Sequence, residues 1–423
     1  MNGYGLSRER FALLFSVMLV AAAGNTAMQS LLPAIGRELG VADLWVALAF
    51  SLSAVLWVVM APVWAHRADR RGRRALMRFG LIGFIASNLI CGGALAFGLA
   101  GLAAPALVFA VFMAGRALYG AFGSASPPAV QAYVAARTEG AGRTSALASL
   151  ASSFGLGTII GPAIAPLFVF APLGLSGPLF VFAGIAALVL AMLALRLPDD
   201  TPRSAARGPI VAYPSIGGGG DSTPSDDTEP TPLRWRDPRV LRWHIVGIVG
   251  GHGQAALLGV IGFLVIDRLN VPLAHAQEAI AIVLMAGAAA SLLAQWGLIP
   301  RLRLAPGQLV LWGSVLAAAG TMMTGFAQSV YGITIGFALA SLGFGLFRPG
   351  FTSGASLAVD LHEQNAVAGQ VTSVNGLAYI AGAPLAVALY QAAAVVPFAA
   401  VAVLMVGLAI WSAAKLRALS PAA

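Results

Sequence analysis

The sequence is poor in charged residues. Only 10% of the 423 residues are Asp, Glu, Lys or Arg, whereas 59% are hydrophobic, and the mean hydropathy is +0.85. Soluble domains carry about a quarter charged residues, because they must present a charged surface to water. A chain of this length with so little charge cannot build such a surface, so the composition predicts an integral membrane protein.

Lysine and cysteine are nearly missing as well. Lys415 is the one lysine among 25 basic residues, and Cys91 is the one cysteine. A single cysteine inside an apolar run excludes a disulfide framework and a thiolate metal site. The arginines gather in short connectors between apolar runs, so the net charge of +9 indicates membrane orientation rather than nucleic-acid binding. We expect no cofactor, no metal and no nucleic-acid partner.

Long apolar runs fill most of the chain, and each can span a bilayer, which takes about 20 residues. The first run has a basic flank like that of a signal peptide, but it is longer, and we interpret it as a retained span. The runs are too uniformly apolar for the alternating strands of a β-barrel. We expect an all-α membrane protein with about twelve transmembrane helices, near 11–35, 45–65, 76–99, 104–134, 143–171, 177–197, 242–266, 276–299, 306–328, 331–357, 366–391 and 394–414.

The arginines orient these helices. With a cytoplasmic amino terminus, the inner connectors hold nearly all basic residues, and the outer connectors hold only Arg37 and Arg268. This asymmetry follows the positive-inside rule. We expect a multi-pass protein of the cell inner membrane with both termini in the cytoplasm.

Residues 198–240 interrupt the apolar pattern with the stretch "GGGGDSTPSDDTEPTP". Such Gly, Pro, Ser and acidic composition predicts a flexible cytoplasmic linker. The linker divides the chain into an amino-terminal six-helix bundle, 1–197, and a carboxyl-terminal one, 241–423. Pro128 precedes Gly161 by 33 residues, and Pro349 precedes Gly382 by the same spacing. Together with the six-linker-six layout, this spacing predicts two repeats related by a pseudo-two-fold axis.

The connector 65–74, "AHRADRRGRR", carries a pattern that resembles the G-x-x-x-D-R-x-G-R-R signature of the major facilitator superfamily, between its second and third spans. Ala65 replaces the leading glycine, and Gly72 suits a tight turn with positive φ. The resemblance implies a conformational latch that closes the cytoplasmic side in the outward-open state. The alternative is that these arginines serve only membrane orientation. The matching residues are Asp69, Arg70, Gly72, Arg73 and Arg74.

Two further motifs strengthen the resemblance. "RALYG", from Arg116 to Gly120 in the fourth span, is similar to R-x-x-Q-G, with Tyr119 in place of Gln. "GTIIGP", which starts at Gly157, resembles the fifth-span signature of twelve-span drug:H⁺ antiporters, including tetracycline-type exporters. The resemblance implies that the small residues of this span pack closely on the opposite bundle. The residues of this packing motif and its second-half counterpart are Gly157, Gly161, Pro162, Gly382 and Pro384.

In this superfamily spans 1, 4, 7 and 10 line a central cavity, so polar residues there are site candidates. We assign substrate binding to Asn25, Gln29, Arg116, Gln254, Asn375 and Tyr379, and proton coupling to His252, Arg116 and Asp267. A charge inside the bilayer is costly unless it faces water or a partner, which makes Arg116 the strongest candidate. The amide and tyrosine residues could equally be interhelical hydrogen-bond partners, and His252 a buried neutral residue bonded to a carbonyl.

Membrane-embedded acids are absent from the middle of every predicted span. Drug:H⁺ antiporters usually carry one, so His252, an acid at a span end such as Asp267, or an ion other than H⁺ must supply the coupling. The missing acid favours a neutral or anionic substrate over a cation, because a cation would require a carboxylate.

The resemblance implies a monomeric secondary transporter that moves a small amphipathic organic compound by alternating access, most simply by proton-coupled efflux. The alternative is a proton-coupled uptake symporter for an organic anion or sugar-like metabolite. An intramembrane enzyme would need catalytic motifs that the sequence lacks, and direct ATP coupling would need a phosphate-binding loop.

Overall fold

The computed structural model describes residues 6–135, 137, 140–170, 173–198, 233–270, 272–302, 304–359 and 363–416. In this part of the chain the regular elements are helices, apart from an isolated bridge between Phe170 and Gly174. The expected all-α fold is confirmed. Most of the expected linker, 199–232, lies outside the described residues, so its conformation stays a prediction.

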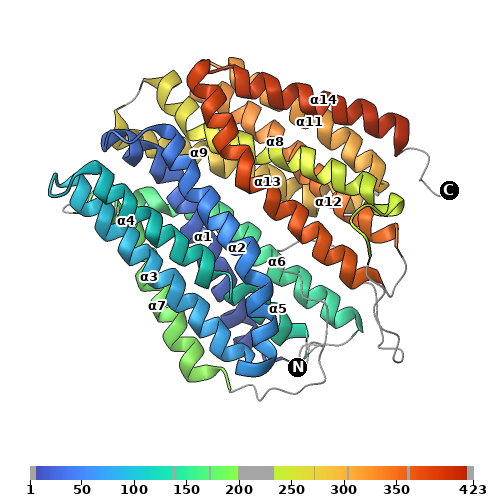
Figure 1. Cartoon of the computed structure of the whole chain (residues 1–423), viewed down its shortest axis with the longest axis horizontal. Coiled ribbons are helices and arrows are strands. Elements are labelled where there is room, and N and C mark those ends of the chain that lie inside the picture. The colour runs from blue at the N-terminus through green and yellow to red at the C-terminus, as the bar shows by residue number, and fades with distance from the viewer. Residues whose placement is uncertain are drawn as a thin grey trace. The chain divides into compact units, whose positions relative to one another are not determined.

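The helices of the first half follow the apolar runs closely (Figure 1). Their ends coincide with arginine-rich or Gly/Pro-rich connectors, where the apolar pattern stops. In chain order they are α1 (Arg8–Glu38), α2 (Asp43–Arg71), α3 (Arg73–Leu99), α4 (Pro105–Leu118), the π-helical turn η1 (Tyr119–Gly123), α5 (Ser126–Ala135), α6 (Gly140–Ile164), the 3₁₀ turn η2 (Ala165–Phe168) and α7 (Gly177–Arg196).

The second half repeats this order after residue 232. Asp237 caps the first of its helices by accepting a hydrogen bond from the Arg239 backbone N–H at 2.9 Å. The elements are α8 (Pro238–Leu269), α9 (Leu273–Leu292), the π-helical turn η3 (Leu293–Leu298), α10 (Ile299–Leu302), α11 (Pro306–Phe326), α12 (Val330–Leu357), α13 (Gln364–Ala392) and α14 (Val396–Lys415).

Eleven helical segments of the described chain are long and apolar enough to span a membrane. The expected fifth span corresponds to α6 and η2, and Leu156–Phe168 is its apolar part among the described residues. Pro162 lies inside α6, and the helix gives way to the 3₁₀ turn two residues later.

The described chain divides into two compact units. The first contains Met1–Gln29, Leu39–Val41 and Leu52–Pro230, and the second contains Ser30–Glu38, Ala42–Ser51 and Thr231–Ala423. The last part of α1 and the first part of α2 therefore belong to the second unit, whereas the sequence placed them in a bundle covering 1–197. Apolar periodicity locates helices but does not reveal which neighbours they pack on.

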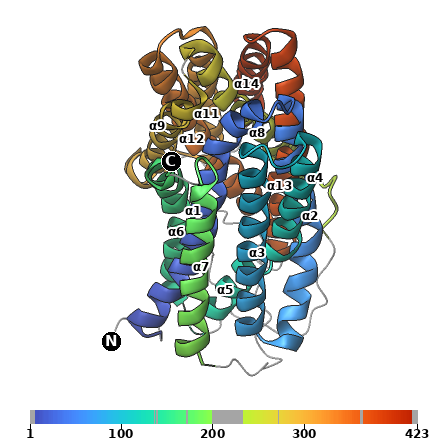
Figure 2. The same ribbon diagram turned by 90° about the vertical axis from the view of Figure 1, so that its left-hand side faces the viewer.

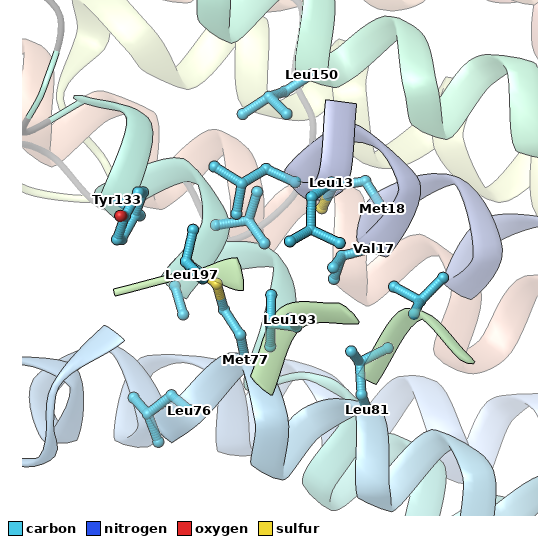
Figure 3. Close-up of a cluster of buried hydrophobic side chains, with 14 of the residues drawn as sticks. Leu13, Val17, Met18, Leu76, Met77, Leu81, Tyr133, Leu150, Leu193 and Leu197 are labelled. Atoms are coloured by element: carbon cyan, nitrogen blue, oxygen red, sulfur yellow. The ribbon is translucent and has the colours of Figure 1, made fainter. Parts of the chain in front are cut away.

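The core of the first unit is built from leucine, valine, methionine and tyrosine side chains. In the close-up of Figure 3, Leu13 and Val17 of α1 lie near Met77 of α3 and Leu193 of α7. All four side chains are at most 7% exposed. Helices α3 and α7 run side by side in both ribbon views (Figures 1 and 2). Both helices contribute side chains to this core.

Candidate substrate and proton-coupling site

Arg116 lies near the end of α4 and is only 3% exposed. Its Nη1 lies 3.5 Å from the Met28 sulfur in α1, and its guanidinium carbon lies 5.1 Å from the centre of the Tyr119 ring. The Ser53 hydroxyl of α2 donates to the Arg116 carbonyl at 2.8 Å. A buried guanidinium next to a thioether and an aromatic face is a strong potential binding group for an anion.

The backbone changes pitch directly after Arg116. Residues Tyr119–Gly123 form a π-helical turn, a feature that is frequent at functional sites. Tyr119 lies in this turn and packs against Trp57 and Phe84, with ring centres 5.5 and 5.8 Å apart. This cluster fixes the Tyr119 ring beside the Arg116 guanidinium.

Asn25 and Gln29 lie one turn apart in α1 and are both half-buried. The Asn25 Oδ1 is a buried atom that makes no hydrogen bond within the described protein. Met28, the Arg116 neighbour, belongs to the same stretch of α1. The structure therefore brings α1 and Arg116 together in the first unit, and substrate contact by Asn25 and Gln29 stays a prediction.

His252 lies in the middle of α8, with Gln254 two residues later. Its Nδ1 lies 2.7 Å from the Ile248 carbonyl oxygen, one turn earlier in the same helix. This contact corresponds to the alternative that the sequence left open, a histidine bonded to a backbone carbonyl. It involves one of the two ring nitrogens, and the proton-coupling role of His252 stays a prediction.

Asn375 and Tyr379 lie one turn apart in α13, as the sequence predicted from their spacing. Asn375 is 7% exposed, and its Nδ2 makes no hydrogen bond within the described protein. The Tyr379 carbonyl accepts a hydrogen bond of 3.5 Å from Ser51 of α2. Their proposed contact with substrate stays a prediction.

Gly157 and Gly161 of α6 pack against α1 within the first unit. A methyl group at Gly161 would lie 2.1 Å from the Ala23 carbonyl oxygen, and one at Gly157 would lie 2.7 Å from the Leu19 carbonyl oxygen. The Thr26 hydroxyl lies 3.3 Å from the Gly157 carbonyl. The expected close packing exists, but against α1 of the same unit. The motif specifies small residues but does not identify the helix on which they pack, so packing of these glycines on the opposite bundle stays a prediction.

Gly382 of α13 makes the corresponding contact in the second unit. A methyl group there would lie 2.9 Å from both the His252 carbonyl oxygen and the Ala255 Cβ of α8. Pro384 follows inside α13, as Pro162 does inside α6. The α6–α1 and α13–α8 contacts thus use equivalent residues, which supports the proposed repeat.

The latch residues are described in part. Gly72 lies between α2 and α3 with φ 83° and ψ 144°, so the predicted positive φ is confirmed. Arg74 Nη2 donates to the Ala194 carbonyl of α7, and Arg73 is half-buried. The side chains of Asp69 and Arg70 lie outside the described residues. The latch role of all five residues stays a prediction.

Gly72→Ala is expected to destabilise the α2–α3 turn by about 1–3 kcal/mol, because this backbone conformation is almost restricted to glycine. The thermal unfolding midpoint of the purified protein measures the effect. Gly93→Ala in α3 is the control, since a methyl group there meets no atom within 4 Å. Equal midpoints for the two variants would contradict the expectation.

A polar cluster joins four helix ends in the second unit. Arg37 of α1 donates to Asp43 of α2, with Nη2–Oδ2 at 2.9 Å, and to both carboxylate oxygens of Asp267 at the end of α8, with Nη2–Oδ2 at 3.1 Å. Tyr390 of α13 donates its hydroxyl to Asp267 Oδ2 at 2.7 Å. The Arg37 guanidinium also faces the Phe263 ring at 5.3 Å. We call Arg37, Asp43, Asp267 and Tyr390 the outer cluster.

The sequence identified one member of the outer cluster, Asp267, and missed the other three. The available signal was Arg37, one of only two basic residues in the predicted outer connectors. An arginine on the outer side departs from the positive-inside rule, which suggests that it has a nearby charged partner. In the structure Arg37 pairs with two carboxylates. Asp267 lies 15 residues beyond His252, about 22 Å along α8, so the two proton-coupling candidates do not form a single site.

A second ion pair joins the other ends of α8 and α13. Arg239 donates to both oxygens of Glu363, at 2.9 and 2.8 Å, and it also donates to Asp237. The hydrogen bond from the Arg239 guanidinium lowers the pKa of the Asp237 carboxyl. Helices α8 and α13 are therefore held together by this pair, by Gly382 and by the Asp267–Tyr390 contact.

The helical spans and the buried polar residues within them define a membrane carrier. The sequence model of the family described as Major Facilitator Superfamily matches residues 14–383 of this chain. The chain belongs to the Major Facilitator Superfamily and is a transporter of organic substrates rather than an enzyme.

Among curated proteins, the chain is similar to the Staphyloferrin B transporter of Staphylococcus aureus (strain NCTC 8325 / PS 47). The two are 28% identical over 209 residues, which cover 48% of this chain and 47% of that protein. The match thus spans about half the length of the relative.

Among solved structures, the fold is similar to a bacterial homologue of the human lysosomal transporter Spinster, with a TM-score of 0.72, 13% identity and 98% of both chains covered. It is also similar to the human organic anion transporter MFSD10, with a TM-score of 0.64, 20% identity, and 96% of this chain and 100% of that one covered. At these identities the likeness concerns the fold.

Proposed function

We propose that this chain is a proton-coupled exporter of small amphipathic organic compounds that are neutral or anionic. It works as a monomer in the cell inner membrane, with both termini cytoplasmic, and two six-helix bundles alternate the access of a mid-membrane site. The burial of Arg116 carries the proposal for the substrate class. A guanidinium that is 3% exposed within a span is stabilised by an anionic or hydrogen-bonding ligand.

The names of two similar proteins support an organic substrate, in one case an organic anion. The curated relative is named for staphyloferrin B, and one structural neighbour is named as an organic anion transporter. The antiporter-type motif at Gly157, Gly161 and Pro162 supports export. Asn25, Gln29, Gln254, Asn375 and Tyr379 would supply the polar contacts that orient the substrate.

The direction of transport is tested in inside-out membrane vesicles. An exporter that exchanges substrate for protons accumulates anionic and neutral test compounds when the vesicle lumen is acidic, and stops when the pH gradient is reversed. The uptake symporter, our second candidate, would instead empty preloaded vesicles under the same acidic-lumen gradient. Accumulation of cationic compounds alone would refute the proposed substrate class.

For the coupling residue, the contacts support Asp267 over His252. We expect His252→Ala to change gradient-driven transport by less than about twofold, because the described contact of its ring stays within α8, whereas the Asp267 contacts join α1, α8 and α13. Initial rates with and without a pH gradient measure this effect. Loss of gradient dependence in His252→Ala, with substrate exchange intact, would make His252 the coupling residue.

A further inference from the structure

We propose that Asp267 binds the coupled proton and that Arg37 then remains bonded to Asp43 alone, which frees the end of α1 and the start of α2 from α8 and α13. This inference rests on the proton coupling proposed above. The outer cluster holds one guanidinium between two carboxylates that come from different helices. Its geometry allows one bond to break while the other keeps the arginine neutralised.

The two carboxylates differ in their access to protons. The Asp267 side chain is 41% exposed, whereas that of Asp43 is 14% exposed. Arg37 bonds each carboxylate through two nitrogens: Asp43 through Nε at 3.2 Å and Nη2 at 2.9 Å, and Asp267 through Nη1 and through Nη2 at 3.1 Å. The two pairs therefore differ in exposure and not in the number of hydrogen bonds. Because Asp267 is the more exposed carboxylate, a proton that enters the cluster reaches it first, and the Arg37–Asp43 pair stays intact.

The other charged groups at these helix ends include Glu38, the exposed last residue of α1, besides groups of α8 and α9. Arg268, next to Asp267 in α8, donates to the Gly325 carbonyl of α11 at 3.1 Å. At the start of α9, His275 and Glu278 lie 4.0 Å apart and are both exposed. In α13 the group that faces Asp267 is Tyr390, which is 6% exposed and whose hydroxyl donates to the carboxylate.

Protonation changes which helices are joined. With Asp267 ionised, Arg37 and Tyr390 connect α1, α8 and α13 through one carboxylate. When Oδ1 takes the proton, the charge that attracts Arg37 is lost, and the neutral acid still bonds Tyr390. The α8–α13 pair persists, because Arg239–Glu363 and Gly382 also hold it. The α1–α8 contact loses its charged bond and is the one that opens.

The test measures helix-end separation and needs no substrate. Spin labels are attached to Ala42→Cys and Gln391→Cys in the full chain, in a Cys91→Ala background and in lipid vesicles, and the label-to-label distance is followed over pH. Both sites are exposed. We expect a short-distance population at neutral pH that is replaced by a longer one on acidification. In Asp267→Asn, which imitates the protonated state, the long population should be present at every pH.

Asp43→Asn is the matched control, since it removes the other carboxylate from the same arginine and should retain the pH response. The proposal is overturned if Asp267→Asn still responds to pH, or if Asp43→Asn abolishes the response while Asp267→Asn does not. Transport in vesicles distinguishes failure of the proposed proton coupling from failure of the proposed proton site. A pH-dependent distance without gradient-driven transport would refute the coupling alone, and gradient-driven transport in Asp267→Asn would refute the proton site alone.

Discussion

Gly161→Ala is expected to destabilise the folded transporter severely. The added methyl group would lie 2.1 Å from the Ala23 carbonyl oxygen and 2.5 Å from the Thr26 hydroxyl oxygen. The first of these is a backbone atom of α1, which cannot move without shifting the helix. Overpacking a tight contact destabilises a protein by about 1–3 kcal/mol and occasionally more. We expect this contact to fall in the upper part of that range. Thermal unfolding of detergent-solubilised protein, followed by size-exclusion chromatography, measures the loss.

Two further glycines provide the comparison. Gly382→Ala meets its neighbours at 2.9 Å and should destabilise the protein less than Gly161→Ala does. Gly184→Ala in α7 meets no atom within 4 Å and should be neutral or slightly stabilising, because alanine favours helix more than glycine does. An unfolding midpoint for Gly161→Ala equal to that of Gly184→Ala would refute the close α6–α1 packing.

Arg116→Met is expected to separate transport from stability. Transport of an anionic compound should fall at least about tenfold, since a hydrogen bond to a charged group contributes on the order of 1.5–3 kcal/mol. The unfolding midpoint should fall less than it does in Gly161→Ala, because methionine keeps the packing with Met28 and Tyr119. Initial transport rates and thermal unfolding of the same preparation measure both effects.

Arg301→Met is the control for this prediction. Arg301 is exposed, donates to the Gly297 carbonyl at 2.8 Å and lies in a short helix far along the chain from the proposed site. It removes the same charge and should leave transport of the anionic compound within about twofold, because an exposed charge contributes little. Equal losses in Arg116→Met and Arg301→Met would indicate a general charge effect and would refute a specific role for Arg116.

The helices were predictable because each apolar run is long and ends at a connector with a clear signal. The arginines before Leu76 and the Gly/Pro pattern after Leu99 mark the two ends of α3, for example. Gly72 was predictable for the same local reason, since a short turn between two helices needs a residue that tolerates positive φ. Local rules of this kind require no knowledge of the neighbouring helices.

The packing partners and the outer cluster were not predictable from the sequence. The motif around Gly161 predicts close helix packing, but no residue near it in the sequence indicates that α1 is the neighbouring helix. Arg37 and Asp267 are separated by 230 residues, and their pairing follows from tertiary structure alone. Asp267 was chosen as an acid at a span end, whereas Tyr390 carried no signal, because a tyrosine at a helix end is common in membrane proteins.

The division of α1 and α2 between the two compact units has a consequence for attempts to produce the halves separately. A fragment that starts after the linker lacks Pro33, whose ring lies where Gly262 offers no side chain, and it lacks Arg37. Its Asp267 would lose its guanidinium, and a strip of α8 would face lipid or detergent. The carboxyl-terminal fragment should therefore fold and stay soluble in detergent only when it is co-expressed with the amino-terminal fragment. A split version of this protein must supply α1 together with α8.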